Sequence, residues 1–190
     1  MFVVLFEVRP KPECWADYLA TAGVLRPELE RIEGFIDNDR YSRERDPGWA
    51  LSLSTWTDEK ALIRWRTHAM HHEIGQVRGR QAIFDDYKLR VGEVTSDTHP
   101  SAGKAIKQLR FDQTEVGEFA ELLLVNGSGP HAGLDGYRGI VDPEQWVTIK
   151  PLAGPQPGAE PGARLRGIRV IREYGMRDRR EAPQYFPAAQ

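Results

Sequence analysis

The chain has 190 residues, of which 40% are hydrophobic and 28% are charged, as is ordinary for a globular protein. Its formal net charge is −2 at pH 7, so it lacks the basic excess typical of proteins that bind nucleic acid or anionic membranes. The single cysteine, Cys14, excludes an internal disulfide, and no apolar run approaches the roughly 20 residues that cross a bilayer. We therefore expect a cytoplasmic protein with no nucleic-acid and no membrane partner.

The first half of the chain predicts an alternation of strands and helices. Short apolar or alternating runs predict strands over residues 2–9, 35–43, 49–56 and 83–94. Apolar residues at three- and four-residue spacing predict a helix from about Glu13, which Pro27 should kink or split. A second helix should start with Thr57 as its N-cap and break near Gly75 or Gly79. This order is that of a ferredoxin-like βαββαβ unit.

The second half repeats the strand pattern of the first. Trp146 follows Trp49 by 97 residues, whereas Tyr174 follows Tyr87 by only 87, so about ten residues are missing between these strands. That is where the first half carries its second helix, and residues 153–162 are too rich in proline and glycine to form one.

These patterns predict an α+β fold made of two ferredoxin-like units, the second lacking its second helix, packed sheet to sheet as an α+β barrel. The expected division is a complete unit at 1–96, a linker at 97–103, a degenerate unit at 104–178 and a C-terminal tail at 179–190.

Several stretches carry a resemblance to a known family. They read FVVLFEVRP, LERIEGF and LSTWTDEKALIRWRTH, followed by GRQAIFDDYKLRV. The chain resembles the antibiotic biosynthesis monooxygenase family, which has a dimeric α+β-barrel architecture. The resemblance implies oxygenation of a small aromatic or quinol-type molecule without flavin or metal, hence no cofactor, and it leaves a homodimer open as a partner.

Three positions depart from relatives whose chemistry is known. Ala61 stands where cofactor-free aromatic oxygenases of this kind often carry an asparagine, one turn before the tryptophan. Glu7 and Gly75 stand where heme-degrading relatives have an asparagine and a histidine. The heme-degrading triad is therefore absent, and the aromatic-oxygenase site is partial.

The predicted second helix carries the best candidates for chemistry. Trp65 could form a flat wall for a ligand, or it could be a core aromatic. His68 and His72 would share its helical face, and either could act as a general base; the alternative is a partly exposed or backbone-bonded histidine. We expect His71 to point away into solvent. His68 and His72 lack a nearby third ligand, so no metal site is expected.

Two functions follow from these residues. The first is a cofactor-independent monooxygenase acting on a small aromatic or quinol-type substrate, with Trp65 as the ligand-binding wall and His68 or His72 as the catalytic base. The alternative is a non-catalytic module of the same fold that binds a small molecule or heme. A purely structural protein is a third reading. Tyr87 should serve in packing the sheet, because its counterpart Tyr174 lies in the half that has lost the site helix.

Overall fold

The structure, a computed structural model, describes residues 1–100, 106, 120–131, 134–153 and 161–183. The strands are β1 (Phe2–Pro10), β2 (Phe35–Arg43), β3 (Ala50–Trp56), β4 (Phe84–Asp97), β5 (Glu121–Gly127), β6 (Gly136–Gly139), β7 (Trp146–Pro151) and β8 (Arg164–Gly175). The helices are α1 (Trp15–Glu30), preceded by a 3₁₀ turn (Pro12–Cys14), and α2 (Glu59–Thr67), followed by π-helical segments at His71–Val77 and Gly79–Ile83.

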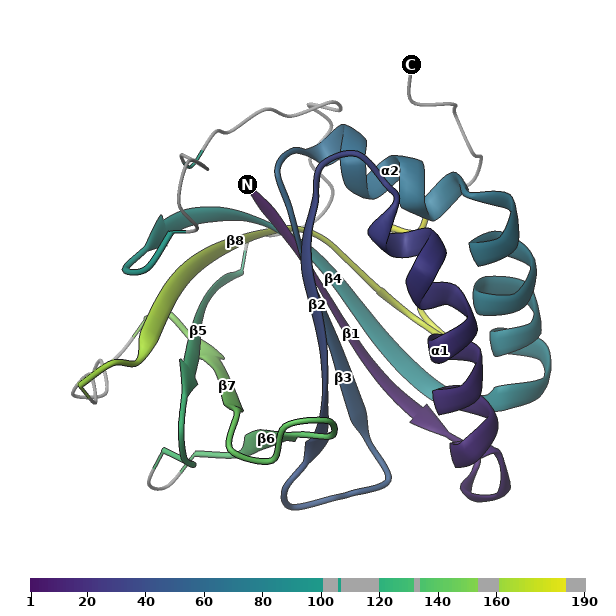
Figure 1. Cartoon of the computed structure of the whole chain (residues 1–190), viewed down its shortest axis with the longest axis horizontal. Coiled ribbons are helices and arrows are strands. Elements are labelled where there is room, and N and C mark those ends of the chain that lie inside the picture. The colour runs from purple at the N-terminus through teal and green to yellow at the C-terminus, as the bar shows by residue number, and fades with distance from the viewer. Residues whose placement is uncertain (101–105, 107–119, 132–133, 154–160, 184–190) are drawn as a thin grey trace.

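The strands close into an eight-strand antiparallel barrel in an α+β fold (Figure 1). Their order around the barrel is β1-β3-β2-β6-β7-β5-β8-β4. Strands of the first half therefore meet strands of the second half at two places. One is the short pairing of β2 with β6, and the other is the long pairing of β4 with β8.

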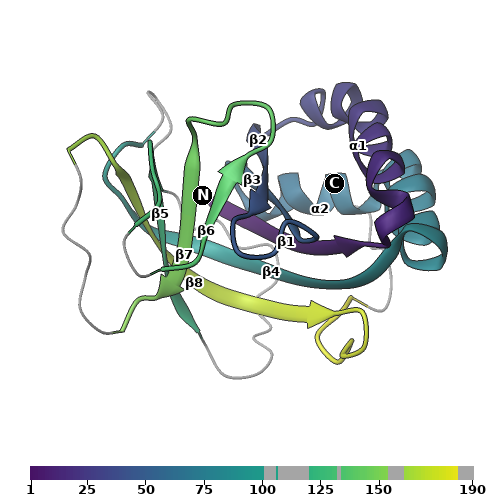
Figure 2. The same ribbon diagram turned by 90° about the horizontal axis from the view of Figure 1, so that it is seen from below.

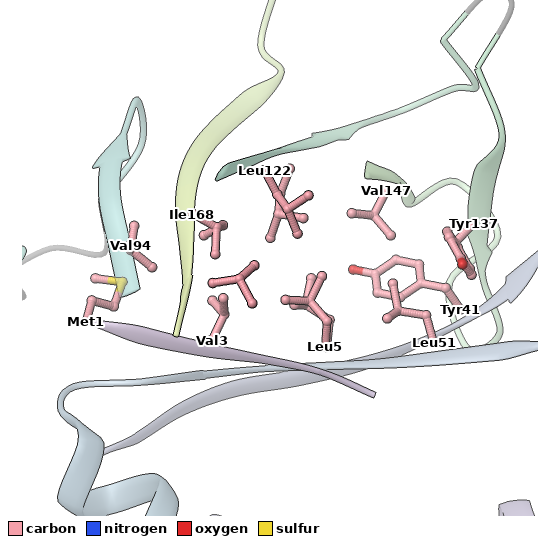
Figure 3. Packing of buried hydrophobic residues seen from close by; sticks show 13 residues of the cluster. Met1, Val3, Leu5, Tyr41, Leu51, Val94, Leu122, Tyr137, Val147 and Ile168 are labelled. Atoms are coloured by element: carbon pink, nitrogen blue, oxygen red, sulfur yellow. The ribbon is translucent and has the colours of Figure 1, made fainter. Parts of the chain in front are cut away.

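Alternation along the strands divides the apolar residues between two faces. On β1, Val3 and Leu5 point into the barrel, where they pack with Leu122 and Ile168 from the opposite strands (Figure 3). Burying a side chain of this size stabilises the fold by about 1.5–3 kcal/mol. Val4, which lies between them on β1, points outward to the helices and belongs to a separate apolar cluster.

The helices gather on the outer side of the first four strands. Figure 2 shows α1 and α2 on the side of β1 and β4, away from β5 and β7. α1 buries Ala22, Leu25 and Leu29 toward the sheet, as its apolar spacing predicts. No helix of the described residues is long and apolar enough to cross a membrane.

Three local predictions differ from the structure. Pro27 does not split α1, which runs unbroken through it to Glu30. The N-cap of α2 is Asp58 rather than Thr57, because the Asp58 carboxylate accepts a hydrogen bond from the backbone N–H of Ala61 at 2.9 Å. The break after α2 comes at His68, whose backbone is extended, rather than at either glycine.

Thr67 explains where α2 ends. Its hydroxyl bonds back to the carbonyls of Ile63 at 2.9 Å and Arg64 at 3.3 Å, a pattern that competes with helix propagation. The prediction that residues 153–162 form no helix falls largely outside the described residues.

Candidate active site

A cavity of about 230 Å³ lies between the helices and the outer face of the first four strands. Its roof comes from α1, α2 and the π-helical segments, and its floor from β1 to β4. The segment after β8 also reaches it, through Arg179 and Pro183. The site is therefore outside the barrel, on the helix-covered side of the first half, while the barrel interior is filled with packed side chains.

The cavity wall is mainly apolar and aromatic. Phe6, Phe84 and Tyr87 form one group, with ring centroids 5.6 to 6.2 Å apart. Trp65 packs with a second group that includes Leu62 and Leu89. Such walls suit a ligand that is largely apolar and carries few polar groups.

Trp65 and His71 form a stacked pair in the wall of the cavity. Their ring centroids lie 4.2 Å apart with an interplanar angle of 14°. The Nδ1 atom of His71 lies 2.9 Å from the backbone carbonyl oxygen of Trp65. The Gln76 amide nitrogen also approaches Nδ1, at 3.3 Å, but the carbonyl contact is shorter and a carbonyl oxygen only accepts. The shorter contact therefore assigns the hydrogen to Nδ1 and leaves Nε2 as the acceptor nitrogen.

Burial keeps this imidazole neutral. It lowers the pKa of His71 to about 4, against the opposing effect of the hydrogen bond to Trp65; the neighbouring His68 and His72 lower it further. A neutral ring with an unprotonated Nε2 at the cavity wall has the form that a general base requires at neutral pH.

The histidines predicted from the sequence take other positions. His68 and His72 are not among the residues that line the cavity, because the chain leaves the helical path at His68. The Nε2 atom of His68 instead lies 3.7 Å from a carboxylate oxygen of Glu28 on α1. The expectation that His71 points into solvent is wrong. Trp65 does line the cavity, as the ligand-wall hypothesis requires.

Gly75 is the feature of the sequence that could have predicted where the His71 side chain lies. A Cβ added at Gly75 would lie 2.8 Å from Cδ2 of His71 and 3.1 Å from Cδ1 of Leu25. The glycine therefore makes room for the imidazole between α1 and the π-helical segment, and its spacing from His71 could have been read as helical contact.

Tyr87 both packs the sheet and joins the cavity wall. It is buried, and its hydroxyl accepts a hydrogen bond from the Arg179 guanidinium. That guanidinium also lies 5.8 Å from the ring centroid of Tyr174, whose pKa is raised by burial. The pair of tyrosines thus anchors the segment after β8 against the first half.

The acidic residues of the described part of the chain lie away from the cavity wall. Among the described residues that line the cavity there is no aspartate or glutamate. Over the part of the chain that the structure describes, no three His, Cys, Asp or Glu side chains lie close enough together to hold a metal ion.

Comparison with known proteins agrees with the resemblance seen in the sequence. The family model described as antibiotic biosynthesis monooxygenase matches residues 1–76. A protein of Pyricularia oryzae named "Jasmonate monooxygenase ABM" is 40% identical over 215 residues, covering 100% of both chains.

Two solved structures match at lower identity. A crystal structure of an antibiotic biosynthesis monooxygenase is 18% identical over 48% of this chain and 95% of its own, with a TM-score of 0.43. A conserved protein from Methanosarcina mazei Go1 is 22% identical over 47% of this chain and 88% of its own, with a TM-score of 0.44. With a relative 40% identical along its whole length, the chain belongs to the antibiotic biosynthesis monooxygenase family.

Proposed function

We propose that the chain is a cofactor-independent monooxygenase for a small, largely apolar ring compound, and that His71 is its general base. The observation that carries the proposal is the Trp65–His71 pair in the wall of the apolar cavity. Trp65 provides a flat surface for the ligand, and Nε2 of His71 is unprotonated.

Jasmonate is the first substrate to consider, because the relative that is 40% identical is named for it. It is a small carboxylate with a cyclopentanone ring, and the ketone acidifies the adjacent C–H bonds. An anthrone or quinol is the second, because aromatic rings such as Phe6 and Phe84 line the cavity beside Trp65.

The proposed reaction needs no external reductant. His71 takes a proton from a substrate CH₂ group next to a carbonyl, and the resulting carbanion gives its electrons to dioxygen to form a hydroperoxide. Loss of water then leaves a new carbonyl, so that CH₂ and O₂ become C=O and H₂O. A ring with a pKa of about 4 is a weak base, so the developing anion must be stabilised by the site. The cationic side chain of Arg66, which lies in the wall on the same helix as Trp65, suits that task.

Oxygen uptake tests this proposal. Protein treated with a chelator and freed of flavin is given jasmonate, an anthrone or a quinol, and one atom of ¹⁸O₂ should enter the product. His71→Asn retains a donor for the Trp65 carbonyl but lacks the base, so kcat should fall by about 10²- to 10⁴-fold. His72→Asn, outside the cavity lining, should stay within about twofold, since it alters no group that meets the ligand.

Two results would overturn parts of the proposal. If none of the three compounds raises oxygen uptake above the buffer rate, the chain is not this kind of oxygenase, and the non-catalytic binding module takes its place. If uptake occurs but the His71 variant remains as active as the wild type while a His68 or His72 variant is inactive, the base has been assigned to the wrong histidine.

We also propose that the barrel consists of two ferredoxin-like units, at 1–96 and 104–178, joined by residues 97–103. The support is the strand order, which reads β4-β1-β3-β2 in the first half and β8-β5-β7-β6 in the second. Each order is that of a ferredoxin-like sheet, with equivalent strands in equivalent places. On this proposal one chain supplies both sheets of a barrel, and Arg179 and Pro183, which follow the second unit, line the cavity of the first.

A further inference from the structure

We propose that the substrate is an amphipathic carboxylate whose anionic end binds Arg40, while its apolar body lies over β1 and β4 against Trp65. This inference rests on the proposed function, since it concerns the ligand of the same cavity. It fixes the orientation of the substrate and names the residue that selects its charge.

The floor of the cavity changes from apolar to polar across the sheet. The strand pairing places Leu89 of β4, Phe6 of β1, Ser52 of β3 and Arg40 of β2 side by side in one row. All of them line the cavity. Neighbouring strands lie about 4.8 Å apart, so the row spans roughly 14 Å from its apolar to its cationic end.

The next row across the floor repeats the change. Val91, Val4, Ser54 and Asn38 follow one another in the same strand order, and all of them line the cavity. The apolar half of the floor thus belongs to β4 and β1, and the polar half to β3 and β2. Trp65 packs in the cluster that contains Val4, Leu89 and Val91, so the catalytic wall stands over the apolar half.

Arg40 is a cation without a carboxylate partner. It forms no ion pair with any carboxylate in the described residues, and its buried Nε atom has no hydrogen-bond acceptor there. Its charge and its side-chain interaction with the Tyr18 hydroxyl oppose the rise that burial causes in the pKa of that phenol, and its charge also opposes the rise in the pKa of Asp39. A guanidinium that has no ion-pair partner in a half-buried wall is costly unless a ligand supplies the anion.

Ser52 provides a second donor beside this guanidinium. Its hydroxyl oxygen accepts a hydrogen bond from the Asn38 amide at 2.9 Å, which leaves the hydroxyl hydrogen to donate. Ser52 and Arg40 are paired across β3 and β2, so the two donors can reach one carboxylate. Arginine is suited to this task because its fork matches the two carboxylate oxygens.

The rest of the wall favours the same charge. Of the residues that the structure describes, five arginines and no acidic residue line the cavity; the arginines are Arg26, Arg40, Arg66, Arg80 and Arg179. Arg26 is exposed and pairs with Glu30 at 2.7 Å, and Arg179 is bonded to Tyr87, so these two have partners at the rim. Arg40 differs from them in rising from the floor of the cavity.

Calorimetric binding of matched acids and esters tests the inference without any turnover. The probes are octanoate, cyclohexylacetate and 1-naphthylacetate, each compared with its methyl ester. Wild-type protein should bind at least one acid about tenfold or more tightly than its ester, because a charge-assisted hydrogen bond is lost in the ester. Arg40→Gln should lower affinity for that acid about tenfold or more and leave the ester within about twofold.

Two further variants complete the design. Arg40→Lys retains the charge but not the fork, so it should recover part of the acid's affinity. Arg31→Gln is the matched control: Arg31 is exposed, pairs with Glu28 at 2.5 Å, and does not line the cavity. It should leave the affinity of both probes unchanged.

Each other outcome contradicts the inference. It is wrong if no acid binds, if esters bind wild type as tightly as acids, or if Arg40→Gln weakens both forms equally. The comparison of acid with ester in the wild type needs no variant, so it holds even if Arg40→Gln fails to fold. Acid selectivity that depends on Arg40, without oxygen uptake, would refute the proposed enzyme and retain the carboxylate site. Oxygen uptake without that selectivity would retain the proposed enzyme and refute the carboxylate site.

Discussion

The hydrogen bond between His71 and the Trp65 carbonyl is the residue-scale feature on which the proposed general-base role depends. It fixes one tautomer of the imidazole and holds the ring flat against the indole, 4.2 Å between centroids. Two residues six positions apart thus orient one another, and the histidine needs no acidic partner to hold it. The ring can then present the same nitrogen to a ligand throughout the reaction.

The lowered pKa of His71 predicts how stability changes with pH. The unfolded ring titrates near its ordinary value of 6.5 and the folded ring at about 4, so between these values the unfolded chain binds more protons. The stability that the neutral ring contributes is therefore fully present above pH 6.5 and is lost as the pH falls toward 4.

Thermal unfolding of wild type and His71→Asn at pH 7.0, 5.5 and 4.5 measures this effect. The amount by which the unfolding midpoint of the wild type exceeds that of His71→Asn should shrink steadily from pH 7.0 to pH 4.5. The reason is that the variant has no proton to take up at this position. His99→Asn, at an exposed site, serves as the control and should track the wild type. If the difference in unfolding midpoint between the wild type and His71→Asn stays constant or grows at low pH, the lowered pKa assigned to His71 is wrong.

At the scale of elements, the turn from α2 into the π-helical segment decides which histidine reaches the cavity. Continuing α2 at 3.6 residues per turn would carry His68 and His72 to the face of Trp65. The back-bonding of Thr67 and the extended backbone of His68 rotate the following residues, so that His71 takes that place. A wider helical turn at a functional site is a known use of π-helix.

Gly75 allows a test of this element. Gly75→Ala would press a methyl group against the His71 ring and Leu25, at 2.8 and 3.1 Å, so the stack with Trp65 should shift. We expect kcat for oxygenation to fall at least tenfold, while the midpoint of thermal unfolding changes little. Gly23→Ala is the matched control on α1: a Cβ there meets nothing within 4 Å, and alanine should stabilise the helix by up to about 1 kcal/mol. Equal kcat in the two variants would show that the position of His71 is unimportant.

The sequence predicted element boundaries well where stop and turn residues mark them, and it misplaced side chains where the helical period is interrupted. β2 occupies the range predicted for it, Phe35–Arg43, because Gly34 ends the segment before it and the turn residues 45–48 follow it. The histidines were misplaced because a regular period was carried past Thr67. Arg40 could be placed on the same side of β2 as Asn38 by alternation, but not in a cavity. That required knowing which face of the sheet the helices cover.

For the whole molecule, a buried polar cluster ties the two halves of the barrel together. Glu7 on β1 accepts hydrogen bonds from Arg90 on β4 and from the hydroxyl of Tyr137 on β6, the latter at 2.6 Å. Burial, and next to it the charge of Glu7, raise the pKa of the Tyr137 hydroxyl, which therefore stays a donor at all moderate pH values. Glu7 thus links the halves rather than serving the cavity, which lies on the other face of β1.

Removing this link should weaken the barrel as a whole. Tyr137→Phe takes away one donor to a partly buried carboxylate, so the free energy of unfolding in urea should fall by about 1–3 kcal/mol in a single transition. A double-mutant cycle with Glu7→Gln isolates the pair, and its two single losses should sum to more than the loss in the double variant. Strict additivity would mean that the two side chains do not act together.

The two joints between the halves are unequal in length. β4 and β8 pair from Lys88 to Asp97, whereas β2 and β6 pair only through Tyr41, Ser42 and Arg43, reinforced by the Arg43–Asp135 ion pair at 2.6 Å. Local opening of the barrel should occur at the shorter pairing, between β2 and β6. It would expose the unpaired backbone edges of both strands, which can pair with another chain. Two molecules opened in this way could pair β2 of one chain with β6 of the other. The strand pairing that closes the barrel within one chain is therefore also the place where domain swapping between two chains is easiest.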